Sequence, residues 1–366
     1  MGIAVQDTSQ TALARAAALD FAIYGDLESI APFGGGLINH TFVSVWDQAG
    51  TRVRYLHQRI NDKVFTRPDQ LMENFARVTA HIAAKTVGMP DHSRRTLTVV
   101  KARSGLPYTR DAEGGWWRAY LFVEGVRAKD VASSPEEARV LGSGVGRFQK
   151  QLADLPPPRL HETIPNFHNM ETRYARFYAA LASDPVKRAH GAREEIAFME
   201  ANEERGMILI RGLQSGRLPE RVCHNDTKMN NIFLDDASGE ALCVADLDTV
   251  MPGTVLFDVG DLIRTVCSRA GEEERDLAKV AFDQRFFDAL IAGYCSEADD
   301  FLTEEEKCLI PEAGRNITHI MALRFLTDYL EGDHYYATSR PGHNLDRCRN
   351  QIALIQSLDA ALRAGV

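Results

Sequence analysis

The pattern of apolar and polar residues in the first third of the chain predicts a small antiparallel sheet. Short apolar runs bounded by turn residues are typical of strands joined by hairpins, and a glycine-rich turn, residues 34–40, joins the first two runs. A helix is expected over residues 68–85, with Pro68 near its first turn. The alanine-rich, amphipathic run over residues 1–20 is expected to form another helix. The predicted strands cover residues 30–33, 41–46, 52–60, 96–102 and 116–122.

From about residue 125 onward, apolar residues recur every three or four positions, which indicates helices. Asp258 most simply caps one of them, because aspartate is favoured at helix N-termini. We therefore predict an α+β fold with an N-terminal lobe built on the sheet, residues 1–124, and a mainly helical C-terminal lobe, residues 125–366. The expected helices cover residues 135–152, 170–183, 192–213 and 254–266, followed by four or five more from residue 271, with interruptions at 296–303 and 332–344.

Two short apolar strands in the second half of the chain end in polar residues. The first leads into His224, Asp226 and Asn231, and the second leads into Asp246. This order and spacing match the catalytic loop of kinases and the metal-binding aspartate that follows it. The alternative is that Asp and Asn only form the turns between strands, as they often do.

Phosphoryl transfer explains why these residue types are needed. We expect Asp226 to orient the attacking hydroxyl and accept its proton, and Lys228 to reach the transferred phosphoryl group. Asn231 and Asp246 are the expected Mg²⁺ ligands, because Mg²⁺ prefers one or two carboxylates together with phosphate oxygens and water. Asp248 can contribute as well.

The predicted sheet offers candidates for binding ATP. Gly35, Gly36 and Asn39 lie in the glycine-rich turn, where backbone N–H groups would cover the phosphates, although an ordinary hairpin would read the same way. The third strand carries Arg59 where kinases carry a phosphate-binding lysine. The alternatives are that Lys63 takes this role or that Arg59 forms only a surface ion pair.

Two further positions complete the predicted nucleotide site. Glu73, on the helix over residues 68–85, could pair with Arg59, although an exposed helical glutamate is as often only solvated. The segment from Leu121 to Val123 would lie against adenine through its backbone groups. Aromatic residues beside it are more often core than ligand contacts.

The run His-Asn-Asp-Thr-Lys-Met-Asn-Asn, residues 224–231, resembles the catalytic loop of the aminoglycoside phosphotransferase and choline kinase superfamily, and in detail that of bacterial N-acetylhexosamine 1-kinases. The similarity runs from about residue 30 to the end of the chain. It implies a two-lobed, protein-kinase-like fold and transfer from ATP, with Mg²⁺, to the anomeric hydroxyl of a sugar. Other similar segments are residues 58–61, 71–74, 164–168, 246–253 and 324–335.

The resemblance also implies further site residues, which the spacing of residues in the sequence does not indicate. Arg324 and Tyr335 would reach the sugar, with Asn225 as a further substrate-binding residue, and an aspartate at the position of Asp258 would brace the catalytic loop. The apolar residues on both sides of Arg324 favour a polar group held in a dry pocket. His161 and His168 are expected to be structural, because two lone histidines do not make a metal site.

Only eleven residues separate Asp246 from Asp258, which leaves no room for the activation segment of a protein kinase. A small-molecule acceptor is therefore expected. The alternatives are an aminoglycoside or choline-type phosphotransferase of the same superfamily, or an ATP-binding protein without catalysis, which only Arg59 would favour. The sugar epimer, the oligomeric state and the pathway stay open.

Composition limits the partners of the protein. A net charge of −9 argues against a nucleic-acid surface, and there is no run of about 18 apolar residues to span a membrane and no signal peptide. The six cysteines form no Cys-x-x-Cys pair, so reduced thiols in the cytoplasm are expected. The predicted partners are a sugar and ATP, with no protein partner evident.

Overall fold

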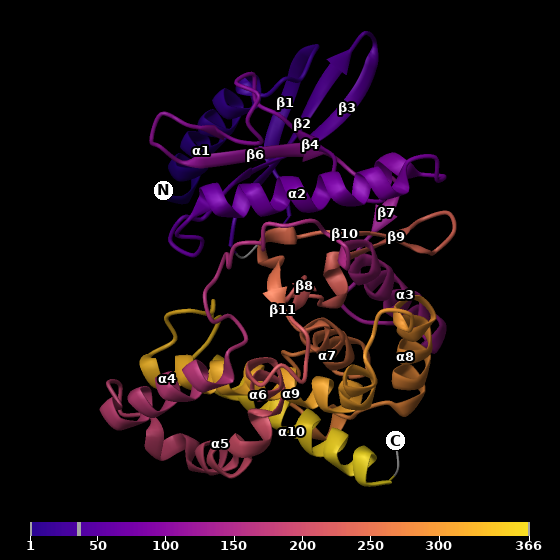
Figure 1. The fold of residues 1–366 in the computed structure, drawn as a ribbon. Helices are drawn as coiled ribbons and strands as arrows, with labels where there is room; N and C mark the ends of the chain where they lie inside the picture. The colour runs from indigo at the N-terminus through magenta and orange to yellow at the C-terminus, as the bar shows by residue number, and fades with distance from the viewer. Residues whose placement is uncertain (1, 35–37, 365–366) are drawn as a thin grey trace. The chain divides into compact units, whose positions relative to one another are not determined.

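The computed structural model describes residues 2–34 and 38–364, with side chains described from residue 9 onward. The chain forms two compact units. The first consists of Met1–Val126, Leu155–Ile164 and Ala245–Val250, and the second of Arg127–Asp154, Pro165–Val244 and Met251–Val366. The expectation of an antiparallel sheet in the N-terminal region and a helical C-terminal region is confirmed (Figure 1).

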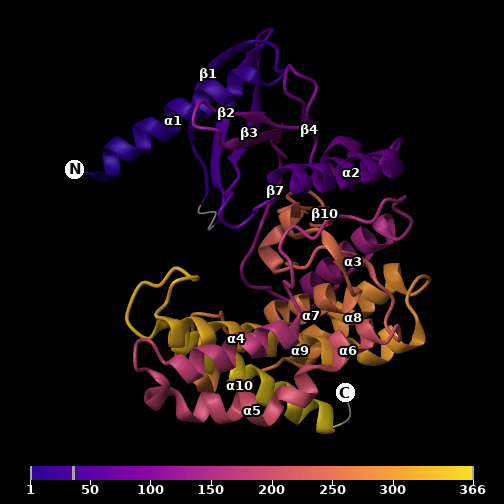
Figure 2. The ribbon, with the colours of Figure 1, turned by 60° about the vertical axis from the view of Figure 1, so that its left-hand side comes forward.

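The first unit is built on an antiparallel sheet with strand order β1-β2-β3-β6-β4, to which β5 adds by pairing with β6. Helices α1 and α2 lie on different sides of this sheet (Figure 2). The strands are β1 (Asp26–Pro32), β2 (His40–Gln48), β3 (Thr51–Arg59), β4 (Val99–Val100), β5 (Thr109–Arg110) and β6 (Trp116–Leu121), and the helices are α1 (Gly2–Asp20) and α2 (Pro68–Thr86).

Alternation along the strands gives the sheet two different faces. One face packs on α1 and forms an apolar cluster that includes Ala18, Phe42 and Trp117. On the other face, Phe75 of α2 contacts the ring of Tyr120 at 6.1 Å between centroids. Odd-numbered residues of β6 therefore face α1 and even-numbered residues face α2.

Asn74 of α2 forms hydrogen bonds with the two later segments of the first unit, Leu155–Ile164 and Ala245–Val250. Its side-chain amide donates to the carbonyls of His161 at 2.8 Å and Val250 at 3.1 Å, and its oxygen accepts from the His161 N–H at 3.0 Å. The residue is buried, so these bonds satisfy backbone groups that water does not reach.

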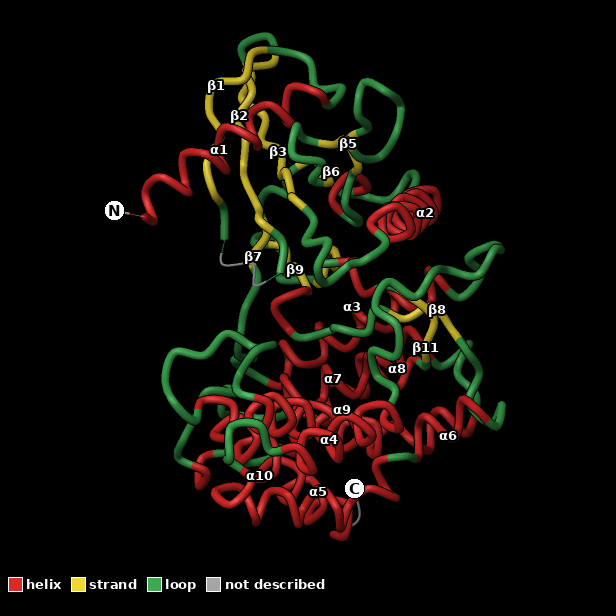
Figure 3. The backbone as a smooth tube through the Cα atoms, turned by 90° about the vertical axis from the view of Figure 1, so that its left-hand side faces the viewer, coloured by secondary structure: helices red, strands yellow, loops and turns green. Residues whose placement is uncertain are grey.

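The second unit is mainly helical (Figure 3). Its helices are α3 (Pro135–Leu152), α4 (Met170–Ser183), α5 (Arg193–Gly206), α6 (Ile208–Gln214), α7 (Val255–Val266), α8 (Gln284–Ala298), α9 (Glu304–Glu331) and α10 (His343–Ala364). Strands β8 (Arg221–Cys223) and β11 (Met251–Gly253) pair with each other, and β9 (Ile232–Asp235) pairs with β10 (Ala241–Val244). The short strand β7 (Val126–Arg127) lies where the chain passes from the first unit to the second.

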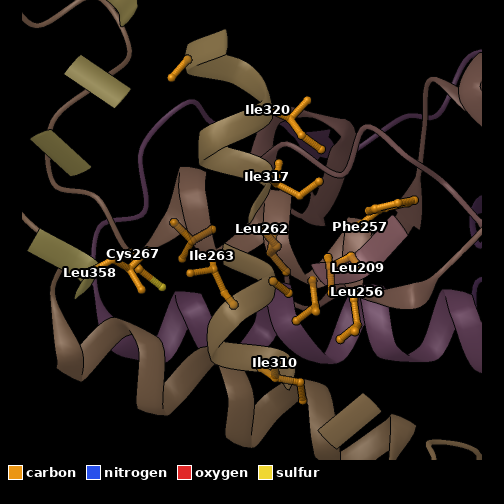
Figure 4. Close-up of a cluster of buried hydrophobic side chains, with 14 of the residues drawn as sticks. Leu209, Leu256, Phe257, Leu262, Ile263, Cys267, Ile310, Ile317, Ile320 and Leu358 are labelled. Carbon is orange, nitrogen blue, oxygen red and sulfur yellow. The ribbon is translucent and has the colours of Figure 1, made fainter. Parts of the chain in front are cut away.

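The core of the second unit is centred on α7 and α9. Leu262 and Ile263 of α7 lie beside Ile317 of α9 in the cluster of Figure 4. Close approach of the two helices depends on Gly260, because a Cβ there would come within 2.4 Å of the Ala313 carbonyl oxygen. A glycine in the middle of α7 therefore reflects helix packing.

Several expected elements differ from the structure. The helix expected over residues 192–213 is divided at Met207 into α5 and α6, and the strand expected over residues 96–102 is reduced to β4. After residue 271 the described chain forms three α-helices and one short 3-10 helix (Leu277–Lys279), four in all, which agrees with the four or five expected. Helix α9 runs for 28 residues, from a capping box at Thr303 to Gly332. No helix of the described residues is both long and apolar enough to cross a membrane.

Candidate active site

The loop after β8 gathers three of the predicted catalytic and metal-binding residues around one carboxylate. Lys228 Nζ lies 3.0 Å from Asp226 Oδ2. The side-chain amide of Asn231 donates to the same carboxylate oxygen at 3.2 Å and to the Asp226 carbonyl at 2.8 Å. The Asp226 N–H in turn donates to His224 Nδ1 at 3.2 Å. The spacing of these residues in the sequence therefore corresponds to a cluster within the second unit.

The environment of Asp226 favours the ionised carboxylate. Burial alone would raise the pKa of Asp226, but the positive charge of Lys228 and the neighbouring His224 ring outweigh it, and the pKa is lowered. At neutral pH the side chain is therefore an acceptor only. A group of this kind can take a hydrogen bond from an approaching hydroxyl and hold it in line for reaction.

Asp258 holds the backbone on which this cluster is built. Its carboxylate is fully buried and accepts from the N–H groups of His224 at 2.9 Å and Asn225 at 2.7 Å. The Thr227 hydroxyl donates to the Asp258 carbonyl at 2.6 Å. The expectation that Asp258 caps α7 is wrong, because Thr254 is the N-cap and accepts from the Leu256 N–H. The bracing role that the resemblance implied is confirmed.

Asn225 helps to hold the loop, and its contact with substrate stays a prediction. Its φ of 64° is left-handed, and its buried amide donates to the carbonyls of Cys223 at 3.1 Å and Met251 at 3.2 Å. His168 Nε2 donates to the Asn225 carbonyl at 2.8 Å. Burial lowers the pKa of His168 to about 3, so the ring is neutral, and its expected structural role is supported.

The two aspartates of the second motif, Asp246 and Asp248, lie in the first unit and have different environments. Asp246 has an exposed side chain and a left-handed backbone, with φ 56° and ψ 55°. Asp248 is buried and accepts from the amide of Asn39 at 2.6 Å and from Arg118. The Thr163 hydroxyl donates to the Asp248 carbonyl at 2.7 Å. Asp248 therefore fixes the segment, and Asp246 is an exposed residue of the same segment.

Arg59 does not form the predicted pair with Glu73. It lies on the α1 face of the sheet, where its guanidinium pairs with Asp111 at 3.0 Å and Glu113 at 2.9 Å. Glu73 of α2 is 2.9 Å from His161 Nε2. The pairing is wrong because the two residues belong to opposite sides of the sheet. The role of Arg59 at the phosphates stays a prediction, and these contacts do not support it.

Arg118 is the residue of this region that the sequence did not single out. It lies on the α2 face of β6, donates twice to Gln58 Oε1, at 2.8 and 2.6 Å, and pairs with Asp248. Its guanidinium also lies over the ring of Phe75, 4.5 Å from the centroid. The only signal in the sequence is a single charged residue inside an otherwise apolar strand, which requires a buried partner.

The other residues predicted to bind the nucleotide are Gly35, Gly36, Leu121 and Val123. Gly35 and Gly36 lie outside the described residues. The Leu121 N–H donates to the Thr98 carbonyl at 2.9 Å, and Val123 is buried. By alternation the Leu121 side chain faces away from α2, in a hollow that it shares with Tyr55. Adenine binding by this segment stays a prediction.

The chemistry of Asn231 and Asp246 fits Mg²⁺. The Asn231 amide nitrogen donates to Asp226, and within the described chain the Asn231 side-chain oxygen has no hydrogen bond. This oxygen and the exposed Asp246 carboxylate are the hard ligands that Mg²⁺ prefers. Among described residues, no group of three or more His, Cys, Asp or Glu side chains could hold a metal alone.

Arg324 and Tyr335, the predicted acceptor residues, line one pocket of the second unit. The Arg324 guanidinium donates to the Tyr335 hydroxyl at 3.4 Å. Burial lowers the pKa of Arg324, but Tyr336, Tyr335 and Asp226 together raise it above its usual value, so Asp226 is within electrostatic range. The pocket is lined by Arg173, Arg176, Arg324, Thr327, Asp328, Tyr335 and Tyr336.

Solved structures with this fold include several phosphotransferases. An aminoglycoside phosphotransferase from Alicyclobacillus acidocaldarius is 14% identical, with 96% of each chain covered and a TM-score of 0.59. An ethanolamine kinase from Plasmodium vivax is 14% identical, covering 90% of this chain and 84% of that one, with a TM-score of 0.53. A spectinomycin phosphotransferase in complex with ADP and spectinomycin is 10% identical, covering 93% and 94%, with a TM-score of 0.54.

At such low identities these likenesses concern the fold. The sequence itself matches a family model over residues 29–301, which includes the whole catalytic loop and both motif aspartates. The chain therefore belongs to the phosphotransferase enzyme family.

Proposed function

We propose that this protein transfers the γ-phosphoryl group of ATP to the anomeric hydroxyl of an N-acetylhexosamine, N-acetylglucosamine or N-acetylgalactosamine, and releases the sugar 1-phosphate. Membership of the phosphotransferase family supports the reaction class. The ADP bound to the spectinomycin phosphotransferase, which shares the fold, supports an adenine nucleotide as donor.

The observation that carries the choice of acceptor is the charge of the pocket that contains Arg324 and Tyr335. Three arginines line it against one aspartate, Asp328. A cationic acceptor such as an aminoglycoside or choline would meet repulsion there, and it would require carboxylates or an open aromatic cage. Guanidinium and phenol groups instead suit the hydroxyl and acetamido oxygens of a sugar.

The residues of the second unit have distinct roles in this proposal. Asp226 orients the acceptor hydroxyl and accepts its proton, and Lys228 stabilises charge on the transferred phosphoryl oxygens. Asp258, through the N–H groups of His224 and Asn225, positions the loop. Arg324 and Tyr335 orient the sugar.

The first unit supplies the proposed nucleotide contacts. Asn39 and the glycine-rich turn would lie at the phosphates, and backbone groups between Leu121 and Val123 would lie at adenine. Asp246 of this unit and Asn231 of the second unit are the proposed Mg²⁺ ligands, and bound Mg²⁺ would neutralise charge on the phosphates. A contact of Arg59 with the phosphates stays a prediction, and its ion pairs with Asp111 and Glu113 give that contact no support.

Phosphorus NMR of the product tests the proposal. Free N-acetylglucosamine or N-acetylgalactosamine, with ATP and Mg²⁺, should give a 1-phosphate that is labile to mild acid. The 1-O-methyl glycosides should give no product, because the methyl group removes both the nucleophile and the proton that Asp226 accepts. A 6-phosphate, turnover of the methyl glycoside, or transfer only to kanamycin or choline would overturn the proposal.

A further inference from the structure

Two of the three arginines in the acceptor pocket have no carboxylate partner within the described chain. Arg173 donates through Nε and Nη2 to one carbonyl, that of Phe167, at 3.3 and 2.6 Å. Arg324 has only the Tyr335 hydroxyl at 3.4 Å and the Met321 sulfur at 3.6 Å. Arg176, in contrast, is paired with Glu331 at 2.9 Å. Most of the N–H groups of Arg173 and Arg324 are therefore available to a ligand.

The carboxylate of Asp328, which also lines the pocket, is occupied elsewhere. Its two oxygens accept from the backbone N–H groups of three consecutive residues, at 3.0, 2.7 and 3.0 Å, and from the amide of Asn344 at 2.8 Å. These bonds hold the segment that carries Tyr335. Asp328 therefore builds the wall of the pocket and forms no ion pair with Arg173 or Arg324. The consecutive donors are His334, Tyr335 and Tyr336.

Aromatic rings restrict the access of water to Arg324. Its guanidinium carbon lies 5.2 Å from the centroid of Phe167, 5.5 Å from that of Tyr335 and 5.4 Å from that of Tyr336. Cation–π contacts partly compensate a half-buried cation, but they leave its planar edge without an acceptor.

Placing two unpaired cations in one half-buried pocket has a cost. Burial and repulsion from Arg324 lower the pKa of Arg173 to about 10. The whole chain has a net charge of −9, yet the charged residues that line this pocket are mainly positive. A positive pocket of this kind favours binding of a negatively charged group. Guanidinium forks recognise carboxylates and phosphates through paired hydrogen bonds.

We infer that Arg173 and Arg324 form an anion-binding subsite for a carboxylate or phosphate monoester carried by the acceptor. The preferred substrate class is then an anionic N-acetylhexosamine derivative that keeps its anomeric hydroxyl free. This inference rests on the proposed function. It adds Arg173, on α4, as a specificity-determining residue.

Kinetics with three acceptors test the subsite: N-acetylglucosamine, its 6-phosphate and its 6-carboxylate. We expect at least one anionic sugar to exceed the neutral sugar in kcat/KM by about tenfold or more, the effect of one charge-assisted hydrogen-bonded contact. Preference for only the 6-phosphate or only the 6-carboxylate identifies which anion the arginines hold. Equal or better turnover of the neutral sugar overturns the inference and leaves the sugar 1-kinase proposal standing.

Variants locate the effect. Arg173→Ala should abolish the anionic preference, and Arg173→Lys should keep part of it through charge alone. Arg211→Ala is the matched control, because Arg211 is exposed and pairs with Glu204 outside the pocket. An unchanged preference in a folded Arg173→Ala protein would contradict the assignment.

A binding measurement separates failure of the subsite from failure of the proposed function. Without ATP, at least one of the 6-phosphate and the 6-carboxylate should raise the Tm of the wild-type protein more than the neutral sugar does, because a ligand of the folded state stabilises it. If none of the three sugars is phosphorylated, the sugar-kinase proposal fails, and this shift still decides the subsite. No shift with either anionic sugar, relative to the neutral sugar, would overturn the subsite as well.

Discussion

Arg118 and Asp248 form a buried ion pair in the first unit, with only 1% and 4% of their side chains exposed. The remaining Asp248 oxygen accepts from Asn39, and Arg118 also donates to Gln58. The pair joins the sheet to the segment that carries Asp246. Asp246 is itself among the groups that raise the pKa of Arg118 against the effect of burial, after Asp248 and Tyr120.

The pair leads to a prediction about stability. Arg118→Met should lower the free energy of unfolding by about 3 kcal/mol or more, because it leaves the Asp248 charge buried without its partner. The double variant Arg118→Met with Asp248→Leu should recover part of this loss, since it removes both charges. Chemical denaturation at pH 7 measures both values. The single variant Asp248→Leu completes the cycle. If the losses of Arg118→Met and Asp248→Leu simply add in the double variant, the two residues do not act as a pair.

Asp226→Asn tests the catalytic assignment. We expect kcat to fall by on the order of 10² or more, because the amide cannot accept the proton of the acceptor hydroxyl. Nucleotide binding, measured by calorimetry, should survive. Asp236→Asn is the control, since Asp236 is exposed and pairs only with Arg127. Near-normal turnover by a folded Asp226→Asn protein would remove the motif from the mechanism.

Arg324→Ala tests the acceptor pocket. Loss of a charged hydrogen bond to substrate in a half-buried site should lower kcat/KM for the sugar by about 2 to 4 kcal/mol, with the KM for ATP nearly unchanged. Tyr335→Phe should have a smaller effect in the same direction, because the ring remains. An equal loss toward sugar and ATP would instead indicate damage to the fold.

Buried histidines make the stability dependent on pH. His57 is fully buried, bonded to Ser44 at 2.8 Å, and burial lowers its pKa to about 4. As pH falls below about 6.5, the unfolded chain takes up a proton that the folded chain refuses, so stability decreases down to about pH 4. One such group accounts for about 3 kcal/mol over this interval.

His57→Gln should therefore reduce the pH dependence of the unfolding free energy between pH 6.5 and 4. His168 and His319 are buried in the same way and will leave some dependence in the variant. His40→Gln is the control, because His40 is exposed on β2. Identical slopes for His57→Gln and wild type would show that the ring is not held neutral.

Apolar residues at helical spacing predicted α3 and α4 to their last residue, and the caps seen in the structure explain where these helices begin. Helix α3 begins after Ser134, which accepts from the Glu137 N–H, with Pro135 in its first turn. Helix α4 begins after Asn169, which caps it in the same way. The catalytic loop could be predicted for a related reason. Its residues Asp226, Lys228 and Asn231 are close in the sequence, so their spacing along the chain already indicates that they lie close together in the structure.

Arrangements that depend on distant segments could not be predicted in this way. The face of the sheet on which Arg59 lies follows from the register of β3 against β2, and a shift of one residue would have turned it toward α2. Arg118 acquires its role only when Asp248, 130 residues later, returns to the sheet. The contact of Asn225 with the Met251 carbonyl could not be predicted either, because it depends on the pairing of β8 with β11.

The discontinuity of the first unit has a consequence for the order in which the protein can be made. A ribosome releases all six strands of the sheet before it has added residues 155–164 and 245–250, which Asn74 and Arg118 bind. Until residue 250 of 366 emerges, Arg118 lacks its counter-charge from Asp248, and Asn74 lacks one of its two acceptors, the Val250 carbonyl. During most of translation the first unit therefore lacks segments that it needs. Synthesis from the N-terminus favours completion of this unit late, after its last segment has emerged, over early folding of one domain after another.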